Sequence, residues 1–225
     1  MPLASEIVPD NPLDFREVYD ISAPLNGAPT YPGDRQCFRE WMAKLDEGKD
    51  YRLSALALSS HAGTHLDFPS HLLEKGRTQN SYCLSRFIIP AQVICVAEED
   101  GSILPSCLQG CKIAKGQALL FQTGNSRRRL MHRAAFSEEF VCLSPEAARL
   151  CAAREVGLVG VDYISVDKYG DDSLPVHRIL LENDILILEG IDLAAVPCGR
   201  YTLLYLPLSL MDAEASPVRA ALVRW

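Results

Sequence analysis

The sequence lacks any long apolar run. None of its hydrophobic stretches approaches the roughly 20 residues that a helix needs to cross a bilayer, which predicts that a membrane is not a partner. The first twenty residues contain acidic residues and prolines where an export signal needs a basic start and an apolar stretch. We therefore expect a cytoplasmic protein.

An excess of positive charge is also missing. Lys and Arg number 22 against 29 Asp and Glu, so the formal net charge is −7 and no general field attracts a polyanion. We therefore do not expect nucleic acid as a partner. The only basic cluster is Arg127, Arg128 and Arg129, which we interpret as a solvated loop, with binding of an anionic substrate group as the alternative.

Closely spaced cysteine pairs are absent as well. The eight cysteines are scattered and none forms a Cys-x-x-Cys pair. Without an export signal we interpret them as small buried apolar residues in a reducing compartment, not as a disulfide framework. A zinc knuckle at Cys107 and Cys111 is the alternative, but it lacks a second ligand pair at suitable spacing.

The composition is that of a globular protein. Hydrophobic residues make up 48% and charged residues 23% of the 225 positions. This length favours one domain with a sizeable core, so we expect a single domain over residues 1–225, with an irregular leader at 1–16.

Strand patterns outnumber helix patterns along the chain. Apolar or alternating runs predict strands at 18–21, 51–59, 87–96, 117–122, 158–166, 185–188 and 201–206. A helix is predicted over 145–155, with Ser144 as N-cap and Pro145 in the first turn, and a second over 175–183. The pattern predicts a mixed α/β fold in which flanking helices surround a β-rich core.

Histidines are few, and three of the five fall within residues 61–71. Gly63 and Pro69 lie in this segment and disfavour a helix, so we predict a turn that leads into an extended stretch. His132 lies apart, in a polar stretch with no carboxylate at ligand spacing, and we interpret it as an ordinary satisfied side chain.

In an extended segment side chains alternate between two sides. His65, Asp67 and His71 then project to one side, while Leu66 and Phe68 point to the other and anchor the segment in the core. The ligands and their anchors are therefore interleaved in one short stretch.

Imidazole and carboxylate side chains together favour a metal site. His61, His65 and Asp67 make a three-ligand set for Zn²⁺ or Mn²⁺ with an open position for water. On a straight strand His71 would lie roughly 20 Å from His65, which is too far for a shared ion. A bend at Pro69 would bring His71 near the metal, though not necessarily onto it, where it could shuttle protons.

The string His61-x-Gly63-Thr64-His65-x-Asp67-x-Pro69-x-His71 resembles the signature of the cyclase family of metal-dependent hydrolases. That family includes bacterial kynurenine formamidase and isatin hydrolase. The resemblance covers roughly residues 17–224 through five further motifs: Asp20-Ile21-Ser22, Tyr31-Pro32-Gly33-Asp34, Thr123-Gly124, Gly160-Val161-Asp162 onward to Asp167, and Pro175-Val176-His177 with Leu188-Glu189-Gly190. It implies a swivelling β/β/α fold and a homodimer or homotetramer.

The resemblance also implies site roles. His61, His65 and Asp67 would bind a first ion, Asp67 and Glu189 would bridge to a second ion held by His177, and His71 would donate and accept protons. From the residues alone, Glu189 is interpreted as a surface carboxylate at a strand end.

The aromatic ring of Tyr31 would line the substrate pocket, where the formamidases usually have tryptophan. The stretch after Thr123-Gly124 also differs from the tryptophan-containing stretch of the formamidases. Both departures leave the identity of the small-molecule substrate open.

The predicted chemistry is hydrolysis of a carbon–nitrogen bond. A bound divalent metal, Zn²⁺ in the first instance with Mn²⁺ as the alternative and one or two ions in number, brings the pKa of its water to about 7, so that hydroxide can attack an amide or formamide. His71 would then protonate the leaving amine. The alternatives are hydrolysis of a cyclic amide or lactone, a non-catalytic metal-binding module, and a structural zinc site.

Overall fold

The computed structural model describes residues 14–97 and 101–225. Most of the leader predicted at 1–16 lies outside these residues, and its last three residues form neither helix nor strand. The first strand begins at Glu17.

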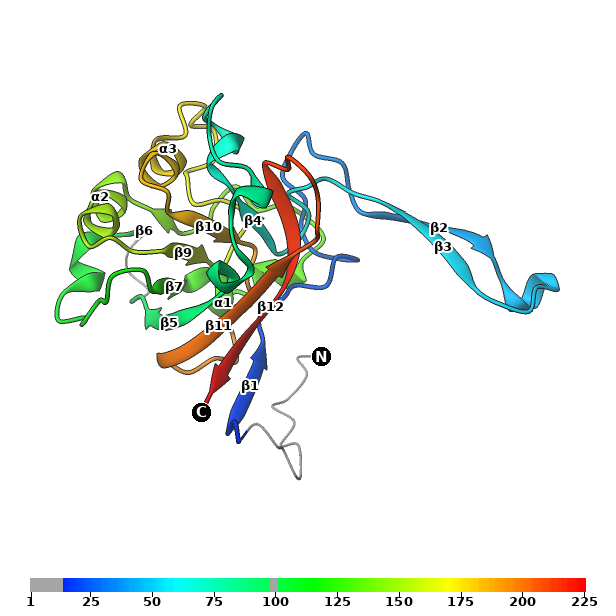
Figure 1. Ribbon diagram of the computed structural model, residues 1–225, viewed down its shortest axis with the longest axis horizontal. Helices are drawn as coiled ribbons and strands as arrows, with labels where there is room; N and C mark the ends of the chain where they lie inside the picture. Colours follow the sequence, from blue (N-terminus) through cyan, green and yellow to red (C-terminus); the bar gives the residue numbers. More distant parts are fainter. Residues whose placement is uncertain (1–13, 98–100) are drawn as a thin grey trace.

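The described chain forms one large sheet that closes on itself (Figure 1). Its strand order is β1-β12-β11-β5-β7-β9-β10-β4, and β4 also pairs with β12, so that β1 alone lies outside the ring. The strands are β1 (Glu17–Asp20), β4 (His65–Asp67), β5 (Ile88–Cys95), β7 (Ala118–Gln122), β9 (Leu158–Val161), β10 (Leu186–Glu189), β11 (Gly199–Pro207) and β12 (Ala215–Arg224).

Two apolar layers pack on the two faces of this sheet. Strands β5, β7, β9 and β10 run parallel, and side chains alternate between the faces, so that Leu120 belongs to one cluster and Leu119 and Phe121 to the other. Helices α2 (Pro145–Ala153) and α3 (Pro175–Glu182) cover the second face. Parallel strands buried on both faces explain the nearly continuous apolar runs in the sequence.

The predicted α/β fold with a β-rich core is confirmed. Helix α2 begins as expected, because the Ser144 hydroxyl accepts a hydrogen bond from the backbone N–H of Ala147. A third helix, α1 (Gly124–Arg127), is a single turn capped by Thr123. In the described part of the chain, no helix combines the length and apolar character that a membrane crossing needs.

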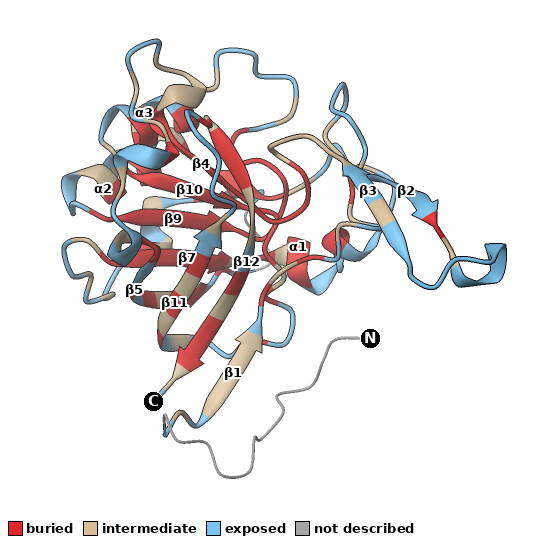
Figure 2. Cartoon of the chain, turned by 45° about the vertical axis from the view of Figure 1, so that its right-hand side comes forward, coloured by how far each residue is buried: buried red, intermediate tan, exposed pale blue. Residues whose placement is uncertain are grey.

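The predicted strand at 51–59 forms, but outside the large sheet. Strand β3 (Leu53–Ala57) pairs only with β2 (Phe38–Ala43), and the two make a hairpin that extends away from the body (Figures 1 and 2). The remaining short strands, β6 (Ser102–Ile103) and β8 (Cys142–Leu143), pair with each other. Strands β2 and β12 were not predicted, because charged residues and, in β12, a proline interrupt their apolar patterns.

The interpretation of the cysteines is wrong in two respects. Cys95 and Cys198 form a disulfide with a Cα–Cα distance of 5.9 Å, since the antiparallel pairing of β5 with β11 brings together residues 103 positions apart. Among the six free cysteines, only Cys142 and Cys151 are buried. Cys107 and Cys111 belong to no metal-ligand cluster within the described residues.

Candidate metal centre

The histidine segment begins with a turn at Gly63. Its backbone has a φ of +63°, and a Cβ there would lie 2.8 Å from the Leu25 side chain, so a larger residue would be strained. The turn leads into β4. Leu66 of this strand points to the side opposite His65 and Asp67, and together with Phe68 it is fully buried in the core. The predicted turn, extended stretch and apolar anchors are therefore confirmed.

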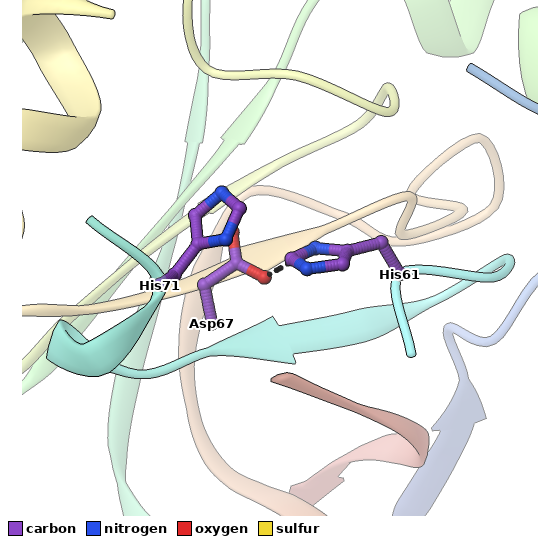
Figure 3. A group of neighbouring side chains, drawn as sticks. All are labelled: His61, Asp67 and His71. Carbon is purple, nitrogen blue, oxygen red and sulfur yellow. Dashed lines mark ion pairs between the residues drawn. The ribbon is translucent and has the colours of Figure 1, made fainter. Parts of the chain in front are cut away.

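The chain bends immediately after β4. Pro69 to His71 forms a single 3-10 turn, and the backbone N–H of His71 donates to the carbonyl of Phe68 at 2.9 Å. The bend returns His71 to the ligand side, and Figure 3 shows its ring and that of His61 on either side of the Asp67 carboxylate. The bend therefore removes the long separation between His65 and His71 that a straight strand would impose.

Strand β10 brings Glu189 to the same place. Glu189 lies opposite His65 in the antiparallel register of β10 with β4. Just beyond, a Cβ at Gly190 would collide with the Gly63 carbonyl, so only glycine allows the two backbones to approach this closely. The Thr64 hydroxyl donates to the Gly190 carbonyl at 2.6 Å and ties the two segments together.

Helix α3 supplies His177 near its N-terminus. The Nδ1 of His177 donates to Asp167 Oδ2 at 2.6 Å, and the same carboxylate accepts the backbone N–H groups of Val176 and His177. The Nδ1 of His65 similarly donates to the Gly63 carbonyl at 3.0 Å. Both rings are thereby held with Nε2 directed at the carboxylates, the orientation that outer hydrogen bonds give to metal-ligating histidines.

Five side chains converge on Asp67: His61, His65, His71, His177 and Glu189. Donor atoms of His61, Asp67 and His71 lie within 4.8 Å of one another, as do those of His65, Asp67 and Glu189. Asp67 is common to both groups. Its Oδ1 lies 3.0 Å from His61 Nδ1 and 3.6 Å from His65 Nε2, and its Oδ2 lies 3.6 Å from His177 Nε2.

These residues fit a divalent cation. Both carboxylate oxygens of Asp67 and the Nε2 of His65 are buried, yet within the described chain they have no hydrogen-bond partner. Leaving such atoms unpaired is costly unless another group binds them. Two ligands about 2.1 Å from one ion lie about 3.4 Å apart at a tetrahedral angle, close to the spacing of these atoms.

The charged groups of the cluster shift one another's pKa values. Burial raises the pKa of Asp67, but His61 and His65 outweigh this and hold the pKa well below its usual range. Burial lowers the pKa of His65, but Asp67 and Glu189 raise it to about 9. Burial lowers the pKa of His71, and it outweighs the opposing effect of Asp67, while the neighbouring imidazoles of His61 and His177 lower the pKa further. The carboxylates are therefore ionised and able to bind a cation.

A pocket of about 320 Å³ opens above the cluster. His61, His65, His71, His177 and Glu189 line its floor, and Tyr31 lines one wall. The Tyr31 ring packs edge-on against Phe136 and Tyr169, which fixes it in place. Tyr31 thus contributes an aromatic ring to the lining of the pocket that holds the donors.

All seven residues singled out from the sequence meet at this pocket or directly beneath it. The others lie elsewhere: His132 binds Asp192 at 2.6 Å, and the exposed Arg128 donates to the Glu139 carbonyl. The surface interpretation of Glu189 is wrong, because it is buried and its Oε1 accepts the N–H of Val166.

Two residues of the site were not predicted. Asp167 orients His177, and Glu214 bonds the Ser60 hydroxyl and lies 3.8 Å from His61 Nε2. An acidic residue ten positions before a suspected ligand is a weak signal for Asp167, and nothing in the sequence pattern indicates Glu214. Each is brought in by a different loop of the sheet.

A cluster of imidazoles and carboxylates on the floor of an open pocket is the arrangement of a catalytic metal site, since a structural site is closed by its own ligands. The family model described as putative cyclase matches residues 19–168, more than half of the chain. The chain belongs to this cyclase family, and the resemblance noted from the histidine segment is confirmed.

Curated relatives and solved structures agree with this assignment. The chain is 34% identical over 205 residues to a kynurenine formamidase of Salinibacter ruber, covering 90% of this chain and 95% of that protein. It is 34% identical over 212 residues to a kynurenine formamidase of Paracidovorax citrulli, covering 92% and 96%.

Among solved structures, one described as a potential metal-dependent hydrolase with cyclase activity has a TM-score of 0.79 at 29% identity, covering 92% of this chain and 98% of that one. Isatin hydrolase A from Labrenzia aggregata has a TM-score of 0.79 at 20% identity, covering 92% and 93%, which shows a shared fold.

Proposed function

We propose that this protein is a metal-dependent hydrolase that cleaves the carbon–nitrogen bond of a small aryl formamide or amide. The observation that carries the proposal is the buried Asp67, which is shared by two groups of donor atoms on the floor of an open pocket. The kynurenine formamidases at 34% identity over nine-tenths of the chain support a linear formamide as the first substrate to test.

The ligand roles are part of the proposal. His61, His65 and Asp67 hold a first ion, and Glu189 and His177 complete the site and hold a second ion where one binds. A divalent ion, when bound, supplies an acidified water and polarises the substrate carbonyl. We propose Zn²⁺ in preference to Mn²⁺, because the donor set is rich in imidazole.

His71 moves the protons in this scheme. Its ring lies at the pocket floor with a centroid 4.4 Å from that of His61 and 5.8 Å from that of His177. From there it accepts a proton from the attacking water and gives it to the nitrogen of the leaving amine. Tyr31 presents its ring to the aromatic part of the substrate.

Substrate turnover by the metal-loaded protein tests the reaction. N-formylkynurenine and simpler aryl formamides are expected to be hydrolysed faster than isatin or a lactone panel. Faster hydrolysis of isatin or lactones would instead establish the cyclic-amide alternative. Absence of turnover on the whole panel would contradict an enzymatic role and support a non-catalytic metal-binding module.

The role of His71 has its own test. His71→Ala is expected to retain metal, measured by elemental analysis, and to lose turnover. Loss of metal together with turnover would instead make His71 a ligand, which its place beside His61 and Asp67 also allows. The same elemental analysis of the wild type gives the identity and number of the ions.

The proposed cytoplasmic location stays a prediction from the sequence. The Cys95–Cys198 disulfide counts against a cytoplasmic location, since such bonds persist mainly in oxidising compartments.

A further inference from the structure

The three proposed imidazole ligands differ in how tightly they are packed. The His61 side chain is 20% exposed, whereas those of His65 and His177 are 2% and 6% exposed. Packing against neighbouring residues therefore restrains the His61 ring least. Its orientation depends more on polar contacts than that of the other two rings.

Each of the two buried rings is held by an acceptor on the side away from the cluster of carboxylates. His177 Nδ1 donates to Asp167 Oδ2 at 2.6 Å, and His65 Nδ1 donates to the Gly63 carbonyl at 3.0 Å. An acceptor of this kind fixes the orientation of a metal-ligating ring and makes its other nitrogen more basic. A comparable group is therefore expected on the outer side of His61.

The outer nitrogen of His61 faces Glu214. His61 Nδ1 lies 3.0 Å from Asp67 Oδ1, while Nε2, on the other side of the ring, lies 3.8 Å from Glu214 Oε1. The second distance is that of an ion pair and is longer than a hydrogen bond. The same Oε1 accepts a hydrogen bond from the Ser60 hydroxyl at 2.6 Å. Because Ser60 directly precedes His61, this hydrogen bond holds the carboxylate beside the ring.

The backbone of Glu214 is fixed as well. Strand β12 pairs with β4 so that Ala215 lies opposite Asp67, and the N–H of Phe68 donates to the Glu214 carbonyl at 2.9 Å. The side chain of Glu214 is 45% exposed, yet its backbone is tied to the segment that carries the proposed shared ligand. The place of this carboxylate is therefore set by the same strand pairing that places Asp67.

We propose that Glu214 is a positioning residue of the metal centre, which together with Ser60 orients the His61 ring so that Nδ1 stays beside Asp67 as a ligand. The inference rests on the ligand roles given in the proposed function, but it does not depend on hydrolysis. Glu214 acts through His61, so its loss should weaken metal binding only while the His61 ring is present.

A Zn²⁺ titration in competition with a chelator measures the affinity of the full-length protein without substrate. Glu214→Gln keeps the length of the side chain and an acceptor for Ser60 but removes the charge, and Glu214→Ala removes the whole group. We expect the affinity to fall by about 10–100-fold in Glu214→Ala and by less in Glu214→Gln, with folding unchanged by circular dichroism. Glu146→Ala, which removes an exposed carboxylate paired with Arg149, is the matched control and should keep the wild-type affinity.

The same substitution in a His61→Ala background separates positioning from a general effect of charge. His65, Asp67 and Glu189 still provide a group of donor atoms in that background, so Zn²⁺ binding stays measurable. We expect Glu214→Ala to change the affinity there by less than about twofold, because the ring on which the carboxylate acts is absent.

Wild-type affinity in Glu214→Ala would overturn the proposal. An equal loss of affinity with and without His61 would also overturn it, because the charge of Glu214 would then act on the ion directly. Failure of the proposed function has a different result. A protein that shows the expected affinities but hydrolyses no formamide, amide or lactone would contradict the hydrolase and leave the role of Glu214 in place.

Discussion

The floor of the pocket and the β2–β3 hairpin, called the arm from here on, are opposite kinds of surface in one chain. On the floor, His65, Asp67, His177 and Glu189 are buried, and two of the rings are oriented by a second group: Asp167 orients His177, and the Gly63 carbonyl orients His65. On the arm, large apolar side chains such as Phe38 and Leu56 are exposed on a hairpin that only its own two strands support.

The difference teaches what each region is built to bind. Burying polar atoms costs free energy unless they are paired, so the unpaired oxygens of Asp67 favour a cation. Exposing apolar surface costs free energy unless another surface covers it, and within the described chain the large apolar side chains of the arm stay exposed. Changes on the floor should therefore alter metal content and turnover, and changes on the arm should leave the stability of the protomer almost unchanged.

Removing Asp67, the proposed shared ligand, should have the largest effect on metal content and turnover. In Asp67→Asn one negative charge is lost from both donor groups, while the shape of the side chain is kept. We expect metal content to fall and kcat/KM to drop by more than about 100-fold, since even groups outside the ligand set change metal affinity by 10–100-fold. Elemental analysis and kinetics measure the two effects. Glu146→Gln, at the exposed start of α2, is the control, and full metal content in Asp67→Asn would remove Asp67 from the ligands.

A pair of leucine truncations compares the packing of the two regions directly. Leu188 precedes Glu189 and is fully buried in the core, so Leu188→Ala should lower the free energy of unfolding by about 2–5 kcal/mol. Leu56→Ala on the exposed arm should change it by less than about 0.5 kcal/mol under conditions where the protein is monomeric. Urea denaturation followed by circular dichroism measures both. Equal losses would mean that the arm is packed within its own protomer.

The part of the site that lies within one local segment was predictable from the sequence. The period of two placed His65 and Asp67 on one side with Leu66 on the other, and Gly63 and Pro69 predicted the turn and the bend. These are local rules of backbone geometry, and they do not depend on what the rest of the chain does.

The rest depends on pairing between distant strands. Glu189 reaches the site because β10 pairs with β4, and Cys95 meets Cys198 because β5 pairs with β11. No local pattern encodes these registers. The prediction of Glu189 came from family resemblance, and that of the cysteines failed. The alternation of Leu53 to Ala57 predicted the strand that forms there, but a local pattern does not encode which sheet the strand joins.

Changing Asp167, which orients His177, should lower metal affinity less than changing a proposed ligand does. In Asp167→Asn the carboxylate that accepts from His177 Nδ1 and from two backbone N–H groups at the start of α3 becomes an amide. We expect metal affinity to fall by about 10–100-fold, with a folded protein by circular dichroism. A competition titration with a chelator measures the affinity. Glu182→Gln, which alters an exposed side chain at the end of α3, is the control. An unchanged affinity in Asp167→Asn would show that helix α3 alone orients His177.

Breaking an ion pair that lies away from both regions should change the free energy of unfolding least. This prediction extends the comparison to partly exposed charges. Asp20 ends β1, and Arg219 of β12 donates to both of its oxygens, at 2.9 Å from Nε and 2.5 Å from Nη2. Burial raises the pKa of Asp20, but the hydrogen bonds from Arg219 and Ser22 outweigh it and lower the pKa. A carboxyl group whose pKa is lower in the folded state stabilises the fold above the pKa of the unfolded chain, and this stabilisation is lost as pH falls through the folded pKa.

The Asp20→Asn variant should therefore be less stable than wild type by about 0.5–1 kcal/mol at pH 7, because the pair is partly solvent-screened. The difference should disappear below the folded pKa, where the wild-type carboxyl group is also neutral. Urea denaturation of both proteins at neutral and at acidic pH measures this difference, with Glu146→Gln as the control for a more exposed ion pair. A difference that persists unchanged in acid would mean that the charge of Asp20 is not the cause. The side chain would then contribute through the hydrogen bond that it accepts from the backbone N–H of Ser22, which asparagine would weaken.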